Sequence, residues 1–99
     1  MDPYVLSDRM RAKLAQADHD VTLKEIDECF SNRERGFLVD SREDHATTPQ
    51  TLWFVALTNQ NRRLKIMFVP ERDGKIFIKS AYPATDNVTR IYERYALEA

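Results

Sequence analysis

The spacing of hydrophobic and polar positions changes after Gly36, from a helical period to the alternation that is typical of strands. Apolar residues recur at helical spacing between Ser7, a suitable N-cap, and Ala17, and the polar residues 18–20 end this first segment. In the next segment, Thr22 and Glu25 have the spacing of a capping box. Its buried stripe would consist of Leu23, Ile26 and Phe30. The pattern predicts two N-terminal helices.

Three strand-like segments follow a short one at residues 37–40 and a polar loop at 41–50. They cover residues 51–58, 62–69 and 75–82, and short turns join them, which predicts consecutive antiparallel hairpins. Thr85 or Asp86 can then cap a last helix. We therefore expect one α+β domain over residues 1–99, with two N-terminal helices, a small antiparallel meander of three to four strands and a C-terminal helix.

Side-chain alternation assigns the strand residues to two faces. If Thr58 pairs with Arg62 and Val69 with Lys75, one face is apolar and forms the core. Its members would be Leu52, Phe54, Ala56, Leu64, Ile66, Phe68, Ile76 and Ile78. The opposite face would combine basic and aromatic side chains, among them Trp53, Arg63, Lys65, Phe77 and Lys79. In this register, Lys65 and Lys79 lie directly opposite each other.

Two like charges at opposing positions of a sheet cost about 0.2–1 kcal/mol. An anion between Lys65 and Lys79 would offset that cost, and Trp53 and Phe77 could stack on nucleobases, a combination typical of proteins that bind single strands. Two other interpretations stay open. Both lysines could extend into solvent over the aromatic rings, or a helix could cover this face and place Trp53 in a second core.

Charge along the chain is more polarised than the formal net charge of −1 suggests. Residues 18–44 hold nine acids and four bases, whereas residues 62–79 hold six bases and two acids. Such a chain can present a basic surface despite its nearly neutral total.

Composition favours a folded cytoplasmic protein. The chain is 42% hydrophobic, has no apolar run of about 18 residues and lacks the basic and apolar segments of a signal peptide at its start. The single cysteine, Cys29, cannot form an internal disulfide. We expect no membrane association and no cofactor.

Candidate proton-transfer groups are few. His45 lies among acids in the polar loop, where it could act as a general base, bind a metal or be solvated; its surroundings lack a recognisable metal-ligand spacing, so we expect no metal. Tyr82, at the end of the last strand, could turn its hydroxyl toward the basic face. Cys29 is expected to be a buried apolar residue on a helix.

The chain resembles the BrnT-type toxins, small members of the RelE-like ribonuclease superfamily of bacterial toxin–antitoxin systems. The resemblance rests on the helical segment DVTLKEIDECF, the strand meander and the segment IFIKSAYPAT, which leads into a helix rich in Arg and Tyr. It departs from these toxins at Tyr82, where they tend to have arginine, and in its slightly acidic total charge.

This resemblance implies metal-independent cleavage of RNA by residues on the sheet, and an antitoxin that covers them. By position, Arg63, Lys65 and Lys79 would hold the phosphate, while Tyr82 or His45 would transfer protons. The competing hypothesis is a non-catalytic interaction module of the same fold, which binds a protein or RNA partner.

Overall fold

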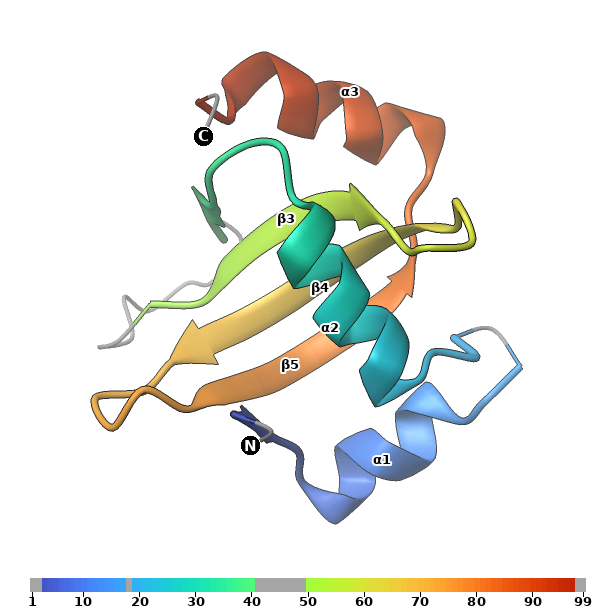
Figure 1. The fold of residues 1–99 in the computed structure, drawn as a ribbon, viewed down its shortest axis with the longest axis vertical. Coiled ribbons are helices and arrows are strands. Elements are labelled where there is room, and N and C mark those ends of the chain that lie inside the picture. Colours follow the sequence, from blue (N-terminus) through green and yellow to red (C-terminus); the bar gives the residue numbers. More distant parts are fainter. Residues whose placement is uncertain (1–2, 18, 41–49, 98–99) are drawn as a thin grey trace.

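The computed structural model describes residues 3–17, 19–40 and 50–97, and within these ranges three helices pack on a five-stranded mixed sheet (Figure 1). The helices are α1 (Asp8–Leu14), α2 (Leu23–Asn32) and α3 (Asp86–Tyr95). The strands are β1 (Tyr4–Val5), β2 (Leu38–Val39), β3 (Leu52–Leu57), β4 (Arg63–Pro70) and β5 (Ile76–Pro83). Their order in the sheet is β1-β5-β4-β3-β2. The α+β class is confirmed.

Side-chain caps fix where the helices begin. The Thr22 hydroxyl accepts a hydrogen bond of 3.1 Å from the Glu25 N–H, and the Glu25 carboxylate accepts one of 3.1 Å from the Thr22 N–H. This is the capping box that the sequence predicts, and it satisfies two backbone donors at the start of α2. The hydroxyls of Ser7 and Thr85 cap α1 and α3 by accepting from the N–H groups of Met10 and Val88, without a reciprocal bond, and α1 ends at Leu14 instead of extending toward Ala17.

The apolar face of the sheet packs against α2, which crosses in front of it in Figure 1. The Phe30 ring of α2 lies 4.7 Å from the Phe54 ring and 5.1 Å from the Phe68 ring, measured between centroids. The predicted core is confirmed: Phe54, Ala56, Leu64, Ile66, Phe68 and Ile78 are buried, and Leu52 and Ile76 pack against them.

The first hairpin has the predicted register. Leu57 lies opposite Arg63 and Leu52 opposite Phe68, and the Thr58 N–H donates to the Arg62 carbonyl at 2.8 Å. The short turn therefore determines the pairing along the whole of β3 and β4.

The predicted register of the second hairpin is wrong. Val69 pairs with Phe77 instead of Lys75, because the hairpin closes at Glu71, whose N–H donates to the Lys75 carbonyl at 2.8 Å. The loop between these two residues ends in Gly74 at φ +84°, a left-handed conformation that favours glycine, as in three-residue hairpin loops. The turn thus uses residues that the simplest closure would assign to the strand.

A β-bulge then shifts the pairing of β4 and β5 by one more residue. Phe68 lies opposite Ile78, but Met67 lies opposite Ser80, so Lys79 is the extra residue of β5. Beyond the bulge Lys65 lies opposite Tyr82, and the expectation that Lys65 faces Lys79 is therefore wrong.

The sheet is also larger than the predicted meander. β1 adds a parallel strand beside β5, with Tyr4 opposite Ile76, and the Ile76 N–H donates to the Pro3 carbonyl at 2.8 Å. A two-residue strand leaves almost no alternation in a sequence, so pattern analysis misses it. In the part of the chain that the model describes, no helix is both long and apolar enough to cross a membrane.

Candidate nucleic-acid interface

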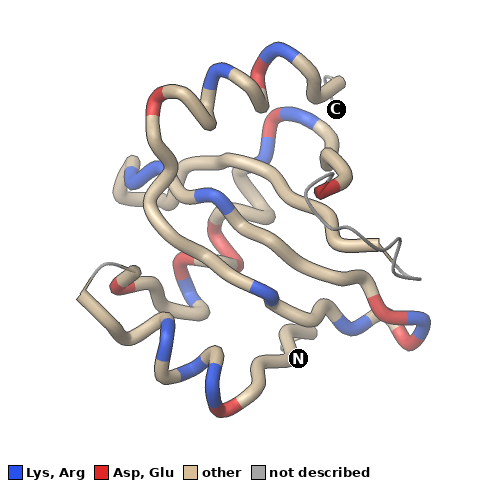
Figure 2. Tube along the Cα trace, turned by 180° about the vertical axis from the view of Figure 1, so that it is seen from behind, with Lys and Arg blue, Asp and Glu red and all other residues tan. Residues whose placement is uncertain are grey.

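The face of the sheet opposite α2, here called the back face, holds four of the predicted site residues. Trp53 on β3, Arg63 and Lys65 on β4 and Tyr82 on β5 all belong to it, because they alternate with the buried core positions. We call these four residues the lysine strip. Figure 2 shows the molecule from this side.

Lys65 is the most buried charged residue among those described, with 6% of its surface exposed. Its ammonium nitrogen lies 4.6 Å from the centroid of the Trp53 ring and 5.8 Å from that of Tyr82. Both distances are within the range of a cation–π contact, which is worth about 2 kcal/mol when the site is desolvated. No carboxylate within the described ranges forms an ion pair with Lys65. Among the described residues, the rings of Trp53 and Tyr82 are therefore the groups that stabilise this charge.

Arg63 is already paired. One of its terminal nitrogens lies 2.6 Å from the Asp86 carboxylate at the start of α3, while its Nε is buried without an acceptor. An incoming phosphate would compete with Asp86 for this guanidinium. Because 86% of the Asp86 side chain is exposed, breaking this ion pair costs little free energy.

Trp53 lies under α3. Its ring centroid is 5.8 Å from that of Tyr92, a buried residue whose hydroxyl donates to the Gly36 carbonyl at 2.8 Å. Burial raises the pKa of Tyr92 above its ordinary value, although Arg33 and Arg35 partly oppose this rise. α3 therefore covers part of the back face, and Trp53 has one face on Tyr92 and another beneath Lys65.

A histidine that the sequence analysis did not select lies beside Tyr82. The rings of His19 and Tyr82 meet edge to face, with centroids 5.9 Å apart. His19 follows α1 in the loop before α2, and Arg62 anchors this loop by donating to the His19 carbonyl at 2.8 Å. Only the tertiary fold brings His19 to the end of β5, and no spacing in the sequence predicts it.

Two other predicted residues lie elsewhere. Lys79 and Phe77 line a groove between β5 and α1 and are not part of the lysine strip. His45 lies outside the described residues. The structure thus brings together Trp53, Lys65 and Tyr82 but separates them from Lys79.

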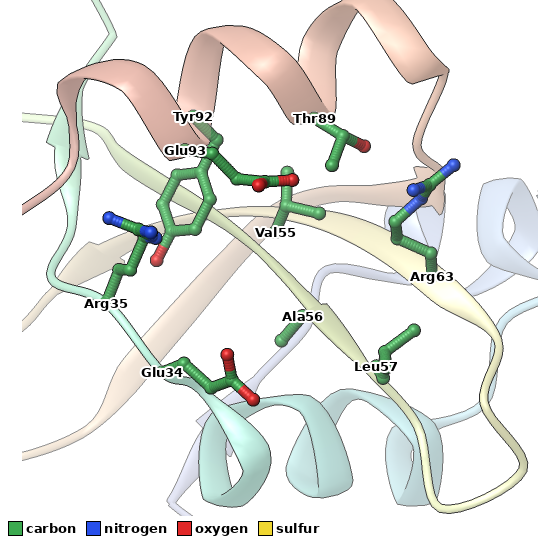
Figure 3. Close-up of a pocket in the computed structure, with 9 residues that line it drawn as sticks. All are labelled: Glu34, Arg35, Val55, Ala56, Leu57, Arg63, Thr89, Tyr92 and Glu93. Carbon is green, nitrogen blue, oxygen red and sulfur yellow. The ribbon is translucent and has the colours of Figure 1, made fainter. Parts of the chain in front are cut away.

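A pocket of about 270 Å³ lies between α3 and the end of β3 and shares Arg63 with the lysine strip (Figure 3). Its floor includes Val55 and Ala56, and Figure 3 shows the carboxylates of Glu34 and Glu93 pointing into it from opposite walls. Arg35 and Arg63 line it as well, so its formal charges balance. Such a pocket has no preference for an anion.

Nucleophilic thiol and metal chemistry have no support among the described residues. Cys29 is completely buried, and this burial raises the pKa of its thiol to about 12, so the reactive thiolate does not form near neutral pH. No group of three or more His, Cys, Asp or Glu side chains in the described ranges is arranged to hold a metal ion.

Comparison with known proteins finds no matching family model, no matching curated protein and no matching solved structure. The likeness to BrnT-type toxins therefore rests on the sequence pattern alone.

Proposed function

We propose that the chain is a toxin-type RNA-binding domain and that it contacts RNA through the lysine strip. The observation that carries this proposal is the position of Lys65, a lysine that is 6% exposed, with aromatic neighbours and no carboxylate partner in the described part of the chain. Its cation–π contacts stabilise the fold, but they leave the ammonium without a counter-charge from the described residues.

A phosphate provides the charge that Lys65 lacks, and a single-stranded RNA carries phosphates next to unstacked bases. Tyr82, which is half-buried, and Arg63, whose side chain is 40% exposed, lie at the rim of the strip. With Lys65, they offer one ring and two cations to a short stretch of nucleotide chain, the combination that sequence-tolerant single-strand binders use.

Fluorescence anisotropy with a labelled single-stranded RNA of about 12 nucleotides tests this function. Lys65→Met keeps the length of the side chain and removes its charge, so we expect affinity to fall about tenfold, or about 1.4 kcal/mol. Lys24→Met, on the exposed surface of α2, is the matched control and should bind as wild type does. Equal affinities for all three proteins would refute the lysine strip as the contact.

Metal-independent cleavage of the bound RNA is the second candidate function, favoured by the position of His19 beside Tyr82. A base would take the proton of a ribose 2′-hydroxyl, the 2′-oxygen would form a bond to phosphorus, and the bond to the 5′-oxygen would break as that oxygen gains a proton. His19 suits the first role because a neutral imidazole nitrogen can accept a proton, and Lys65 would stabilise the charge on the phosphate.

One experiment distinguishes cleavage of the RNA from binding. Products of the same RNA are analysed by gel in the presence of EDTA, beside an anisotropy measurement on each variant. We expect His19→Ala to bind RNA and to lose cleavage. If wild type binds without cleaving, the domain is a non-catalytic RNA-binding module. If it does not bind at all, a protein such as an antitoxin becomes the partner to identify.

A further inference from the structure

A basic groove runs between α1 and β5, away from the lysine strip. It has a volume of about 300 Å³, and its lining includes Arg9, Met10, Lys13, Phe77, Ile78 and Lys79. In Figure 2, basic segments mark α1 along most of its length. No Asp or Glu lines the groove, in contrast to the pocket under α3.

The three cations of the groove have no partners among the described residues. Arg9, Lys13 and Lys79 are exposed, and none of them forms an ion pair or a side-chain hydrogen bond within residues 3–17, 19–40 and 50–97. Other charged residues of this protein do find partners, such as Arg62 with Glu25 and Arg63 with Asp86. The groove therefore concentrates positive charge that the fold leaves uncompensated.

Helix stability does not explain Arg9, although Lys13, in the last turn of α1, suits the helix dipole. Arg9 and Lys13 are four residues apart and so share one side of the helix, where like charges repel. Arg9 also lies in the first turn, where the helix dipole disfavours a cation. An arrangement that opposes local preference in this way is expected where the residues serve a function.

The β-bulge places the third cation. Without it, Lys79 would pair across β4 and project from the sheet like its neighbours; as the extra residue of β5, it lines the groove beside α1. Bulges are enriched at sheet edges and next to functional sites because they redirect a side chain. Phe77, two residues earlier and half-buried, adds an aromatic ring to the same lining.

We infer that this groove is a second contact line for single-stranded RNA, in which Arg9, Lys13 and Lys79 neutralise backbone phosphates and the Phe77 ring stacks on a base. Arg9 and Lys13 are about 6 Å apart along the helix axis, which suits successive phosphates of an extended strand better than one isolated anion. The inference rests on the proposed function, since it assigns further residues to the same ligand, but it concerns a different surface from the lysine strip.

Salt dependence is the sharpest test, because each neutralised phosphate contributes about 0.7 to the slope of log affinity against log salt concentration for a single strand. Anisotropy with the labelled RNA is measured between low and physiological salt. We expect Arg9→Ala/Lys13→Ala/Lys79→Ala to reduce the slope by about 2 and to bind at least about tenfold more weakly at low salt. Thermal melting shows whether each variant is folded.

The matched control removes three exposed cations elsewhere that form no ion pair with another described residue: Lys24→Ala/Arg72→Ala/Lys75→Ala. It changes the net charge by the same amount as the groove variant. Because these cations lie outside the groove, we expect a slope close to that of wild type. A further variant, Phe77→Leu, separates stacking from charge: affinity should fall about tenfold with no change of slope.

The outcomes distinguish this inference from the proposed function. If the groove variant keeps the slope and affinity of wild type while Lys65→Met weakens binding, the groove does not contact RNA, and the proposed function of the lysine strip is supported. If both triple variants reduce the salt slope equally, the RNA responds to the overall positive charge of the protein, and the groove is not a specific contact. Absence of RNA binding by wild type overturns both proposals.

Discussion

Arg62 connects three parts of the fold, and its removal is the most informative test of how the loop that carries His19 is held. Its guanidinium contacts the Glu25 carboxylate of α2 at 3.0 and 3.2 Å, and it also donates to the carbonyls of His19 and Asp20. Asp20 is in the left-handed region, with φ 47°, so the loop before α2 depends on such anchors. Arg62→Ala removes every one of these contacts.

The expected cost follows from the exposure of the pair. The Arg62 and Glu25 side chains are 31% and 22% exposed, so the ion pair itself is worth about 0.2–1 kcal/mol. The hydrogen bonds from the charged guanidinium to two carbonyls add about 1.5 kcal/mol. We therefore expect Arg62→Ala to lower the free energy of unfolding by about 2 kcal/mol, and the melting temperature by about 10 °C.

Urea unfolding and thermal melting measure both quantities. Arg62→Lys keeps the charge without the planar fork, so we expect it to recover less than half of the loss. A double-mutant cycle with Glu25→Gln isolates the ion pair, whose coupling should be about 0.5–1 kcal/mol. RNA cleavage, where present, should fall in Arg62→Ala, because the His19 carbonyl loses its anchor.

An Arg62→Ala variant that melts within about 2 °C of wild type would contradict this account. In that case water replaces the guanidinium at both carbonyls without cost, and the loop is held by its own backbone bonds. One of these is the bond from the Val21 N–H to the Leu14 carbonyl, 3.0 Å long.

Three further predictions concern stability and reactivity. Ile26→Ala, at a completely buried position, should cost about 2–5 kcal/mol in urea unfolding. Cys29 should react with a thiol reagent only at the rate of unfolding, since burial raises its pKa to about 12. Burial raises the pKa of Glu25, but hydrogen bonds from Arg62 and Thr22 outweigh this and lower it below its ordinary value. Its stabilisation is thus fully present above the ordinary pKa of a glutamate and is lost as the pH falls through the lower folded pKa, so the destabilisation caused by Glu25→Gln should be largest at neutral pH and should shrink as the pH falls.

The core and the helix starts are predictable from the sequence because they depend on local chemistry. Thr22 and Glu25 are three residues apart, and their reciprocal bonds need nothing from the rest of the fold. Alternation in β3 and β4 likewise places Phe54 and Ile66 on the buried face whatever lies on either side.

The site is less predictable because it depends on register and on tertiary contacts. The loop that ends in Gly74 shifts the register of the second hairpin by two residues. The bulge at Lys79 shifts it by one more residue, so Tyr82, and not the expected Lys79, lies opposite Lys65. The position of His19 depends on how the loop after α1 folds back. A signal for the groove does exist in the sequence, in the like charges of Arg9 and Lys13 at helical spacing.

A nearly neutral total charge is compatible with RNA binding because the acids and bases differ in what they contact. On α2, Glu25 accepts from Arg62, Asp27 from the Tyr4 hydroxyl at 2.7 Å and Glu28 from the Asn59 N–H at 3.0 Å. These carboxylates are used within the fold, whereas the groove cations and Lys65 have no acid partner in the described ranges. At physiological salt a charge acts over about 8 Å, so a phosphate in the groove responds mainly to the three cations that line it. The local balance of charge, and not its sum of −1, therefore decides what this surface binds.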